Sequence, residues 1–124
     1  MLNYAQMKEY VYKRLKELAS KEDLITYSDL LREMSINEQD SWEEGQHKKL
    51  RDILGEISSE EHKKGNPLLS ALVIHKEGDQ LPGKGFFAGL FEQIGRKPIL
   101  DPDERLRVWL LEIKKLYKKW KQKN

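Results

Sequence analysis

One apolar segment, PLLSALVIHK over residues 67–76, constrains the fold of this chain more than any other feature. It stands out because 35% of the 124 residues are charged. The run has the length of a strand, ends in β-branched residues and lacks polar alternation, which is typical of a central strand buried on both faces. Its natural neighbour is the short β-prone run LITY, residues 24–27, and we expect the two to pair in antiparallel fashion.

The rest of the chain predicts helices. Apolar residues recur at spacings of three and four in five segments, as one buried helix face requires. The five predicted helices cover residues 4–19, 26–34, 41–65, 86–95 and 102–122. Side chains that accept hydrogen bonds from a first helical turn precede several of them. These predicted N-caps are Asn3, Thr26, Ser41 and Asp101.

The last helix has the clearest signals. Asp101 is a suitable N-cap, Pro102 fits the first helical position and Glu104 complements the helix dipole at its start. One apolar stripe is expected to face the core, with the basic residues outside it. The stripe consists of Leu106, Trp109, Leu110, Ile113, Leu116 or Tyr117, and Trp120.

These elements predict one domain over residues 1–124. A chain of this length buries enough surface for a single core, and aliphatic and aromatic residues make up 38% of it. The expected class is α+β and mostly helical, with about five helices and a small antiparallel sheet. We interpret this combination as a winged-helix-like domain with a long, basic, amphipathic C-terminal helix over residues 102–122.

The charge of the chain is unevenly distributed. Its net charge is +2, but residues 105–124 carry eight bases and one acid, whereas residues 1–104 carry 15 bases and 20 acids. A basic segment of this kind favours an anionic partner. Lysines in the last turns of a helix also complement the helix dipole, so the pattern is equally typical of a solvated helix end.

The sequence argues against several other functions. The chain contains no cysteine, which excludes disulfides and thiolate chemistry, and the start lacks the apolar stretch of a signal peptide. We therefore expect a cytoplasmic protein without membrane segments. His47, His62 and His75 lack metal-ligand spacing, so no metal or other cofactor is predicted. A hydrolase site around His62 and His75 is conceivable, but we expect a protein without enzyme activity.

The segment GDQLPGKG, residues 78–85, resembles a phosphate-binding loop only in part. Gly85 stands where such a loop needs Ser or Thr for Mg²⁺, and Pro82 removes one amide donor. The motif also requires a multi-stranded parallel sheet, which a chain with one strong strand cannot build. We predict a glycine-rich turn between strand and helix, whose lysines contact a nucleic-acid phosphate if they contact any.

The order of the motifs LITYSDLL, NPLLSALVIHK and a glycine-rich turn resembles the DNA-binding domain of alkylguanine alkyltransferases and alkyltransferase-like proteins. In that family the strand after Asn-Pro ends in Pro-Cys-His-Arg or Pro-Trp-His-Arg. Aligned on Asn66-Pro67, the corresponding residues here are Val73, Ile74, His75 and Lys76. The reactive cysteine is absent, so the resemblance implies binding without alkyl transfer, with Lys48 nearest to the family's base-flipping arginine. The core PLLSALV with PGKGFF is also similar to small bacterial winged-helix-like proteins of unassigned function.

Two functions remain open. The first is non-enzymatic binding of duplex DNA, with the third predicted helix in the groove, the glycine-rich turn as a wing and the C-terminal lysines on phosphates. The predicted contact residues are Lys48, Lys49, Arg51, Lys76, Lys84, Lys114, Lys115 and Lys118. The alternative is a protein-binding domain, such as an immunity protein, an antitoxin or a subunit of a defence complex, because residues 1–104 are acidic and complementary charge directs protein association.

Overall fold

The computed structural model describes residues 2–34, 45–76, 78 and 80–121, and these residues are mostly helical. They form five α-helices, two short strands, one 3₁₀-helical segment and one π-helical segment. In chain order the elements are α1 (Tyr4–Ser20), β1 (Ile25–Thr26), α2 (Tyr27–Glu33), α4 (Gln46–Lys63), the 3₁₀ segment η1 (Leu69–Leu72), β2 (Val73–Ile74), the π-helical segment η2 (Gly85–Leu90), α5 (Phe91–Gln93) and α6 (Pro102–Trp120).

Three helices begin where the sequence predicts. The Asn3 side chain accepts from the Gln6 amide, and the Gln6 side chain accepts from the Asn3 amide, which completes a capping box on α1. Thr26 caps α2 through the Asp29 amide. Asp101 caps α6, and Pro102 occupies the first turn. These side chains satisfy amides that a helix start leaves without partners, so local sequence sets the helix starts.

The start of α4 differs from the prediction. The helix begins at Gln46 after Gly45, whose φ of 71° lies in the left-handed region that glycine adopts without strain. The predicted cap Ser41 and its partner Glu44 lie outside the described residues. The predicted apolar stripe is confirmed, since Leu50, Ile53, Leu54 and Ile57 are all buried.

The apolar segment is not one long strand. Leu69–Leu72 winds into the 3₁₀ turn η1, and only Val73–Ile74 is extended. Leu69, Ala71 and Leu72 have no exposed surface, so a compact turn buries them on every side. The prediction of burial is confirmed for residues 68–73, but His75 and Lys76 are exposed. The prediction of a strand over the whole run is wrong, because an uninterrupted apolar run does not distinguish a buried strand from a buried helical turn.

The two strands are parallel, which corrects the antiparallel sheet expected from the sequence. Ile25 pairs with Val73 and Thr26 pairs with Ile74 in one two-stranded sheet. The connection between them contains α2, α4 and η1, and a long helical crossover is what a parallel pair requires. The pair is therefore not the antiparallel hairpin from which a wing is built, and the winged-helix interpretation stays a prediction.

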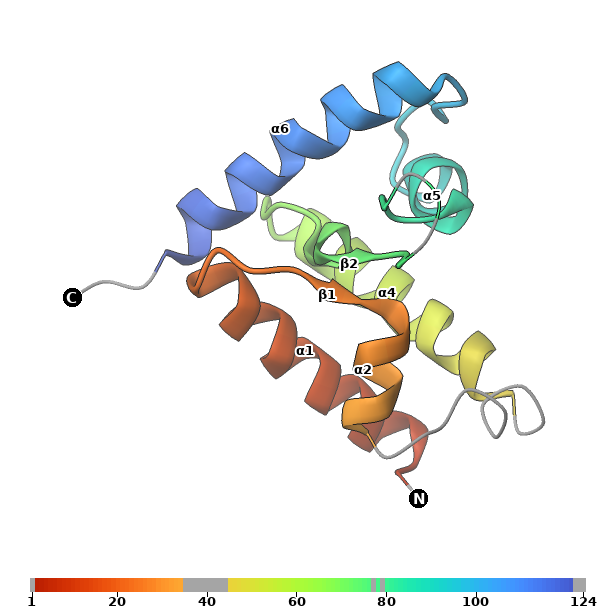
Figure 1. The fold of residues 1–124 in the computed structure, drawn as a ribbon, viewed down its shortest axis with the longest axis vertical. Coiled ribbons are helices and arrows are strands. Elements are labelled where there is room, and N and C mark those ends of the chain that lie inside the picture. Colours follow the sequence, from red (N-terminus) through yellow and green to blue (C-terminus); the bar gives the residue numbers. More distant parts are fainter. Residues whose placement is uncertain (1, 35–44, 77, 79, 122–124) are drawn as a thin grey trace.

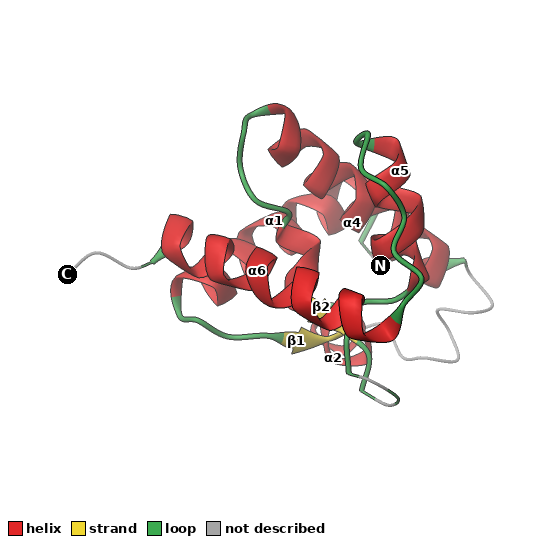
Figure 2. Ribbon diagram, turned by 90° about the horizontal axis from the view of Figure 1, so that it is seen from above, coloured by secondary structure: helices red, strands yellow, loops and turns green. Residues whose placement is uncertain are grey.

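The core lies around η1. Helices α1 and α4 pack against each other on one side of η1, and α6 packs against η1 and α1 from the other side (Figure 1). The small sheet lies beside this stack, with α2 leading away from β1 (Figure 2). Because η1 touches three long helices, the most apolar segment of the sequence forms the centre of the molecule.

Two buried polar contacts hold η1 in place. The Ser58 hydroxyl of α4 lies 2.6 Å from the Ser70 hydroxyl and accepts from the Ser70 amide at 2.9 Å. The Glu112 carboxylate of α6, only 2% exposed, accepts from the Leu68 amide at 2.7 Å and from Arg96 at 3.4 Å. A buried amide needs such a partner, so these side chains fix both helices relative to the backbone of the central turn.

The segment after the glycine-rich turn is helical, as predicted, but not a regular α-helix. Its first part, η2, has π-helical hydrogen bonding and continues directly into α5. Phe86, Phe87 and Phe91 are buried and form a cluster of edge-on and tilted rings with centroids 5.0 to 6.1 Å apart. This aromatic cluster anchors one wall of the cleft described below.

Helix α6 matches its predicted length but not its predicted buried face. Ile113 and Leu116 are buried as expected, but Leu106 and Leu110 are 46% and 49% exposed. Glu112 explains why the buried face differs from the predicted one. Its carboxylate accepts from the Leu68 amide, and this hydrogen bond rotates the helix so that part of the predicted apolar stripe points outward. No helix in the described part of the chain has the length and apolar character needed to span a membrane.

Candidate functional site

A cleft of about 900 Å³ lies where α2, the first half of α4, β2 and the segment after it meet. One side is formed by Tyr27 and Ser28 of α2 and by residues of α4 from His47 to Gly55. The other side is formed by residues 73–76 and 82–86, with Leu90 behind them. Three stretches that are far apart in the sequence therefore meet at one concave surface, which is the usual form of a ligand site.

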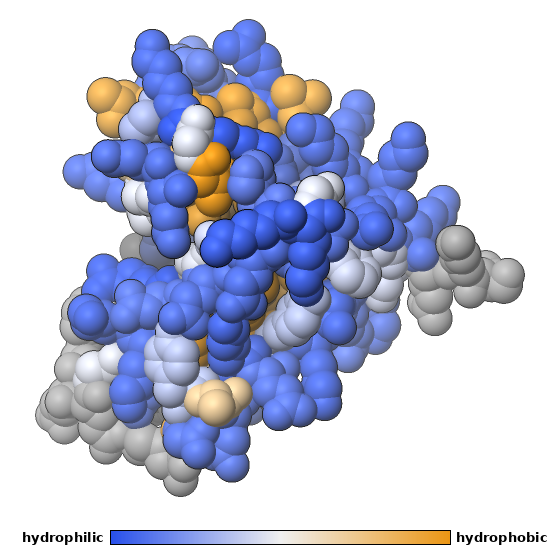
Figure 3. Space-filling view, turned by 180° about the vertical axis from the view of Figure 1, so that it is seen from behind, coloured by the Kyte–Doolittle hydropathy of each residue, from blue (hydrophilic) through white to orange (hydrophobic). Residues whose placement is uncertain are grey.

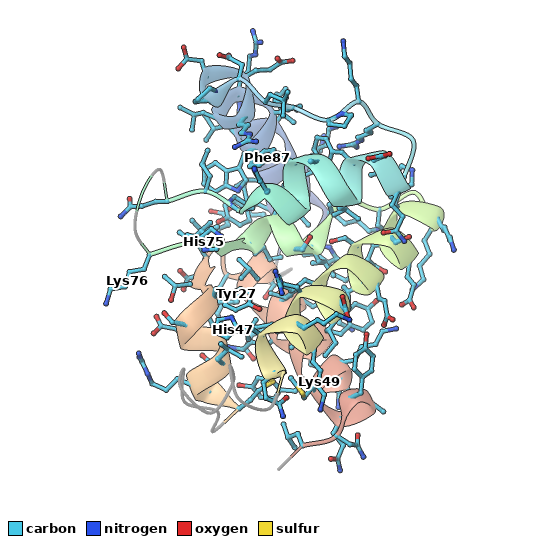
Figure 4. All side chains as sticks on the ribbon, turned by 90° about the vertical axis from the view of Figure 1, so that its right-hand side faces the viewer. Tyr27, His47, Lys49, His75, Lys76 and Phe87 are labelled. Carbon is cyan, nitrogen blue, oxygen red and sulfur yellow. The ribbon has the colours of Figure 1, made fainter. Side chains whose placement is uncertain are left out.

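Three rings line up along the cleft. The Tyr27 ring stacks on His47, with centroids 5.2 Å apart and an angle of 18° between the planes. On its other side it faces His75 at 6.3 Å and 28°. Figure 4 shows Tyr27 between the two imidazoles, which come from α4 and from the end of β2. The three residues come from three elements, so the column exists only in the complete fold.

Tyr27 also ties α2 to α4. Its hydroxyl donates to the backbone carbonyl of His47 at 2.6 Å. Burial raises the pKa of the Tyr27 phenol to about 12, the Arg51 guanidinium opposes the rise, and the Asp52 carboxylate adds to it. Tyr27 is therefore an uncharged donor at neutral pH, and its ring is held in place as a fixed wall of the cleft.

Basic side chains surround this column. Arg32 of α2, Arg51 of α4, and Lys76 and Lys84 of the turn after β2 line the cleft, and none of its described lining residues is an acid. Arg32 is bonded to Asp29 at 2.8 Å, which neutralises part of its charge. Arg51, Lys76 and Lys84 form no ion pair within the described residues. The cleft therefore presents three uncompensated cations on a concave surface, where a shared anion can contact more than one of them.

The described residues between His75 and Lys84 make a turn at the outer edge of the cleft. The His75 amide donates to the Leu81 carbonyl at 3.1 Å, which closes the turn and brings the chain back beside the end of β2. Gly83 then lies directly against the His75 imidazole, because a Cβ atom at this position would come within 2.5 Å of Nε2. The absence of a side chain at Gly83 therefore makes room for the His75 ring.

The structure separates the predicted contact residues into two groups. Arg51, Lys76 and Lys84 line the cleft. Lys48 forms an i,i+4 ion pair with Asp52, and neither Lys48 nor Lys49 lines the cleft (Figure 4). The predicted residues Lys114, Lys115 and Lys118 lie on α6, which contributes nothing to it. One anionic ligand in the cleft therefore contacts at most the first group.

Several lining residues are not among the predicted contacts, and they include Tyr27, His47, His75 and Arg32. The sequence predicts Tyr27 at the end of a strand and offers His47 only as a possible metal ligand. Spacing in the sequence gives no sign of their contact, because 20 residues separate His47 from Tyr27 and 28 separate it from His75. The only local indication of this site is the pair Thr26-Tyr27 at the junction of strand and helix, because a residue at that junction lies at the edge of the sheet.

The turn and its surroundings do not form a nucleotide phosphate loop. The two strands of the described chain are two residues long, and the helix after Lys84 begins as a π-helical segment. Among the described residues no three His, Cys, Asp or Glu side chains lie together as metal ligands. What the cleft offers is cations, imidazoles and aromatic rings.

The chain matches no family model, and comparisons with curated proteins and with solved structures give no match either. The resemblance to the alkyltransferase DNA-binding domain therefore stays a prediction. Within it, Val73, Ile74, His75 and Lys76 all line the cleft, whereas Lys48, aligned near the family's arginine, does not.

Proposed function

We propose that this protein binds DNA and that the cleft beside Tyr27 is the contact surface. One observation carries the proposal: uncompensated cations and a column of rings converge on a concave surface whose described lining contains no carboxylate. Nucleic acids are the common ligands that present both phosphates and flat rings, and both kinds of group have a counterpart here.

The phosphate contacts are assigned to Arg51, Lys76 and Lys84. Arg51 comes from α4, whereas the two lysines come from the opposite edge of the cleft. A strand that passes along the cleft therefore meets cations on both sides. Lys76 extends outward from the turn, where it can contact a phosphate outside the cleft (Figure 4). Such contacts release counterions and make binding depend steeply on salt.

The ring column is assigned to an unstacked base. The cleft volume of about 900 Å³ falls in the range of small-ligand sites, so a single nucleotide fits inside it and a duplex does not. His75 is exposed and lines the cleft, so a base entering the cleft has a ring surface to contact. The alkyltransferase resemblance supports the same role, and Ile74 in place of the reactive cysteine limits that role to binding.

The protein-binding alternative is less well supported by the surface. It rested on the acidic character of residues 1–104, but many of these acids are already paired within the molecule. Lys8 contacts Glu56 and Glu60, and Arg14 contacts Glu17 and Glu33. Paired carboxylates attract a basic partner less strongly than the net charge of the segment suggests.

The proposal is tested with fluorescein-labelled 20-base-pair duplexes, one matched and one carrying a central mismatch, and with a single strand. Fluorescence anisotropy at 50 and 200 mM salt measures the affinity. Three phosphate contacts predict a fall in affinity of roughly 40-fold between these salt concentrations. The mismatched duplex is expected to bind more tightly than the matched one, because its base is easier to unstack. Absence of binding at 50 mM salt, or binding that salt does not change, would refute the proposal.

A further inference from the structure

The exposed apolar side chains of the described residues are concentrated in one short stretch. The large ones are Leu100, Leu106, Leu110 and Leu111, with exposed fractions of 76%, 46%, 49% and 54%. The apolar surface gathers around the first half of α6 (Figure 3). Single exposed leucines are common on soluble proteins, but four within 12 residues of a chain with 35% charged residues form a patch.

The patch continues along α6 as a stripe with opposite charges at its two ends. Asp103, Leu106, Leu110 and Lys114 follow one another at spacings of three, four and four, which places them on the same face of the helix. All four are exposed, whereas Glu112 on the opposite face is buried. Asp103 and Lys114 form no ion pair within the described residues. We call these four residues the α6 stripe.

We infer that the α6 stripe binds the same stripe of a second copy of this chain, with the two helices antiparallel. A two-fold symmetric contact requires a surface that is complementary to itself. The stripe meets this requirement, because antiparallel pairing places Asp103 of each copy beside Lys114 of the other and the leucines between them. Antiparallel pairing also brings each helix N-terminus near the other's C-terminus, where the helix dipoles attract.

The charge pattern favours a second copy over other occupants. A nucleic acid would be attracted by Lys114 but repelled by Asp103 and by its neighbour Glu104. A uniformly basic partner would be attracted by Asp103 and Glu104 but repelled by Lys114. The leucines also need an apolar counterpart, and the stripe of a second copy supplies one of matching length. One helix face is a small interface by the standards of stable dimers, so we expect association in the micromolar range.

The first experiment measures molar mass by light scattering and sedimentation between about 5 and 500 µM protein, without DNA. The wild-type protein is expected to rise from the monomer mass toward twice that mass. Leu110→Glu is expected to remain monomeric throughout, because it places a carboxylate in the apolar centre of the contact. Its circular dichroism spectrum should be unchanged, since Leu110 does not belong to the core. A wild-type protein that is monomeric at 500 µM, or dimerisation that Leu110→Glu leaves intact, would overturn the inference.

A charge-exchange experiment tests the antiparallel arrangement. Asp103→Lys gives a stripe with two positive ends, and Lys114→Glu gives one with two negative ends, so each variant alone is expected to lose at least tenfold in dimer affinity. An equimolar mixture of the two is expected to recover a heterodimer. Lys115→Glu is the matched control, because it makes the same change one residue away on a different face, and it should dimerise like the wild type. A mixture that fails to associate, or a control that loses as much affinity as Lys114→Glu, would exclude this arrangement.

Discussion

The molecule carries two basic regions that differ in shape rather than in charge. In the cleft, Arg51 of α4 and the two lysines of the opposite edge, Lys76 and Lys84, face a common concave surface lined with rings. On the second half of α6, the lysines follow one another along an exposed helix. The excess of bases on α6 is conspicuous in the sequence, whereas the sequence predicts Arg51, Lys76 and Lys84 as contacts but does not predict that they meet in one cleft. Convergence of charges in space, and not their density along the chain, makes a candidate site.

The difference has a physical basis. Cations on a convex helix point away from one another into water, where each is solvated and screened separately. Cations around a cleft act on the same enclosed volume, and the surrounding protein of low dielectric constant strengthens their combined field. The rings of the cleft add stacking that an exposed helix does not provide. The cleft and the α6 lysines should therefore contribute very unequally to DNA binding.

The largest effect is expected from removing charge in the cleft. Arg51→Gln combined with Lys84→Gln eliminates a cation from each side and should weaken binding of the mismatched duplex by roughly 100-fold, at about tenfold for each lost charged contact. Anisotropy titrations at 50 mM salt measure this loss. The same titrations as a function of salt should show a slope about 2 units shallower. If the double variant binds like the wild type, the cleft is not the DNA contact.

A smaller loss is expected from closing the space beside His75. In Gly83→Ala the new Cβ atom would lie 2.5 Å from Nε2 of His75, so the ring must leave the column. His75 is exposed and can move, and Gly83 has no positive φ, so the melting temperature should change by less than about 2 °C. Affinity for DNA should fall by about tenfold through the lost stacking.

The neighbouring glycine supplies the matched control for this variant. A Cβ atom at Gly85 meets nothing within 4 Å, so Gly85→Ala should keep wild-type affinity. His75→Ala removes the ring itself and should reproduce the loss of Gly83→Ala. Equal affinities for Gly83→Ala and the wild type would show that the ring column does not contact the ligand.

Arg14 and Tyr10 of α1 bind Glu33 of α2, and this contact is expected to stabilise the helix that carries Tyr27 into the cleft. Arg14 contacts both carboxylate oxygens of Glu33, at 2.9 and 3.0 Å, and Tyr10 donates to the same group at 2.7 Å. The hydrogen bond from Arg14 lowers the pKa of Glu33. Glu33→Gln should therefore cost about 1 kcal/mol at pH 7, measured by urea unfolding, because both partners remain partly exposed.

The lowered pKa of Glu33 determines how the destabilisation by Glu33→Gln changes with pH. The carboxylate contributes to stability above its unfolded-state pKa of about 4.3. That contribution is lost as the pH falls through the folded-state pKa, so the difference between Glu33→Gln and the wild type should shrink toward pH 3. Glu9→Gln, which removes a more exposed pair with Lys13, should differ little from the wild type at either pH. A constant difference from pH 7 to pH 3 would argue against a role for this ion pair.

The smallest effect is expected on α6. Lys115→Gln combined with Lys118→Gln removes two bases of the C-terminal region without touching the cleft or the α6 stripe. DNA affinity at 50 mM salt should change by less than about threefold, because dispersed surface charges act at long range and are screened. A loss as large as that of the cleft variants would reverse the comparison and place a main contact on α6, whose lysines are also among the contact residues predicted from the sequence.

The sequence predicts those helices that depend on interactions between residues close together in the chain. Cap residues such as Asn3, Thr26 and Asp101 bond to amides three positions away, so their effect can be recognised without a fold. The amphipathic stripe of α4 is equally local in its spacing. Helix positions and the identity of most core residues follow from such signals.

The features that the sequence does not predict depend on contacts between distant residues. The parallel pairing of β1 and β2 follows from the helical connection between them, whereas the two short runs by themselves do not indicate the direction of pairing. The exposure of Leu106 and Leu110 depends on the hydrogen bond between Glu112 and the buried Leu68 amide, which lies 44 residues away in the sequence. The ring column depends on three elements meeting, and no spacing of Tyr27, His47 and His75 in the chain encodes it.

The parallel pair also determines when the site can form. Two residue pairs, Ile25 with Val73 and Thr26 with Ile74, close a loop that contains α2 and α4, and closing a long loop costs chain entropy before any contact compensates for it. The helices can form early through their caps, but Tyr27 and His75 come together only when this loop is closed. DNA binding should therefore disappear at a lower urea concentration than helical circular dichroism does, which makes ligand affinity a more sensitive measure of complete folding than helix content.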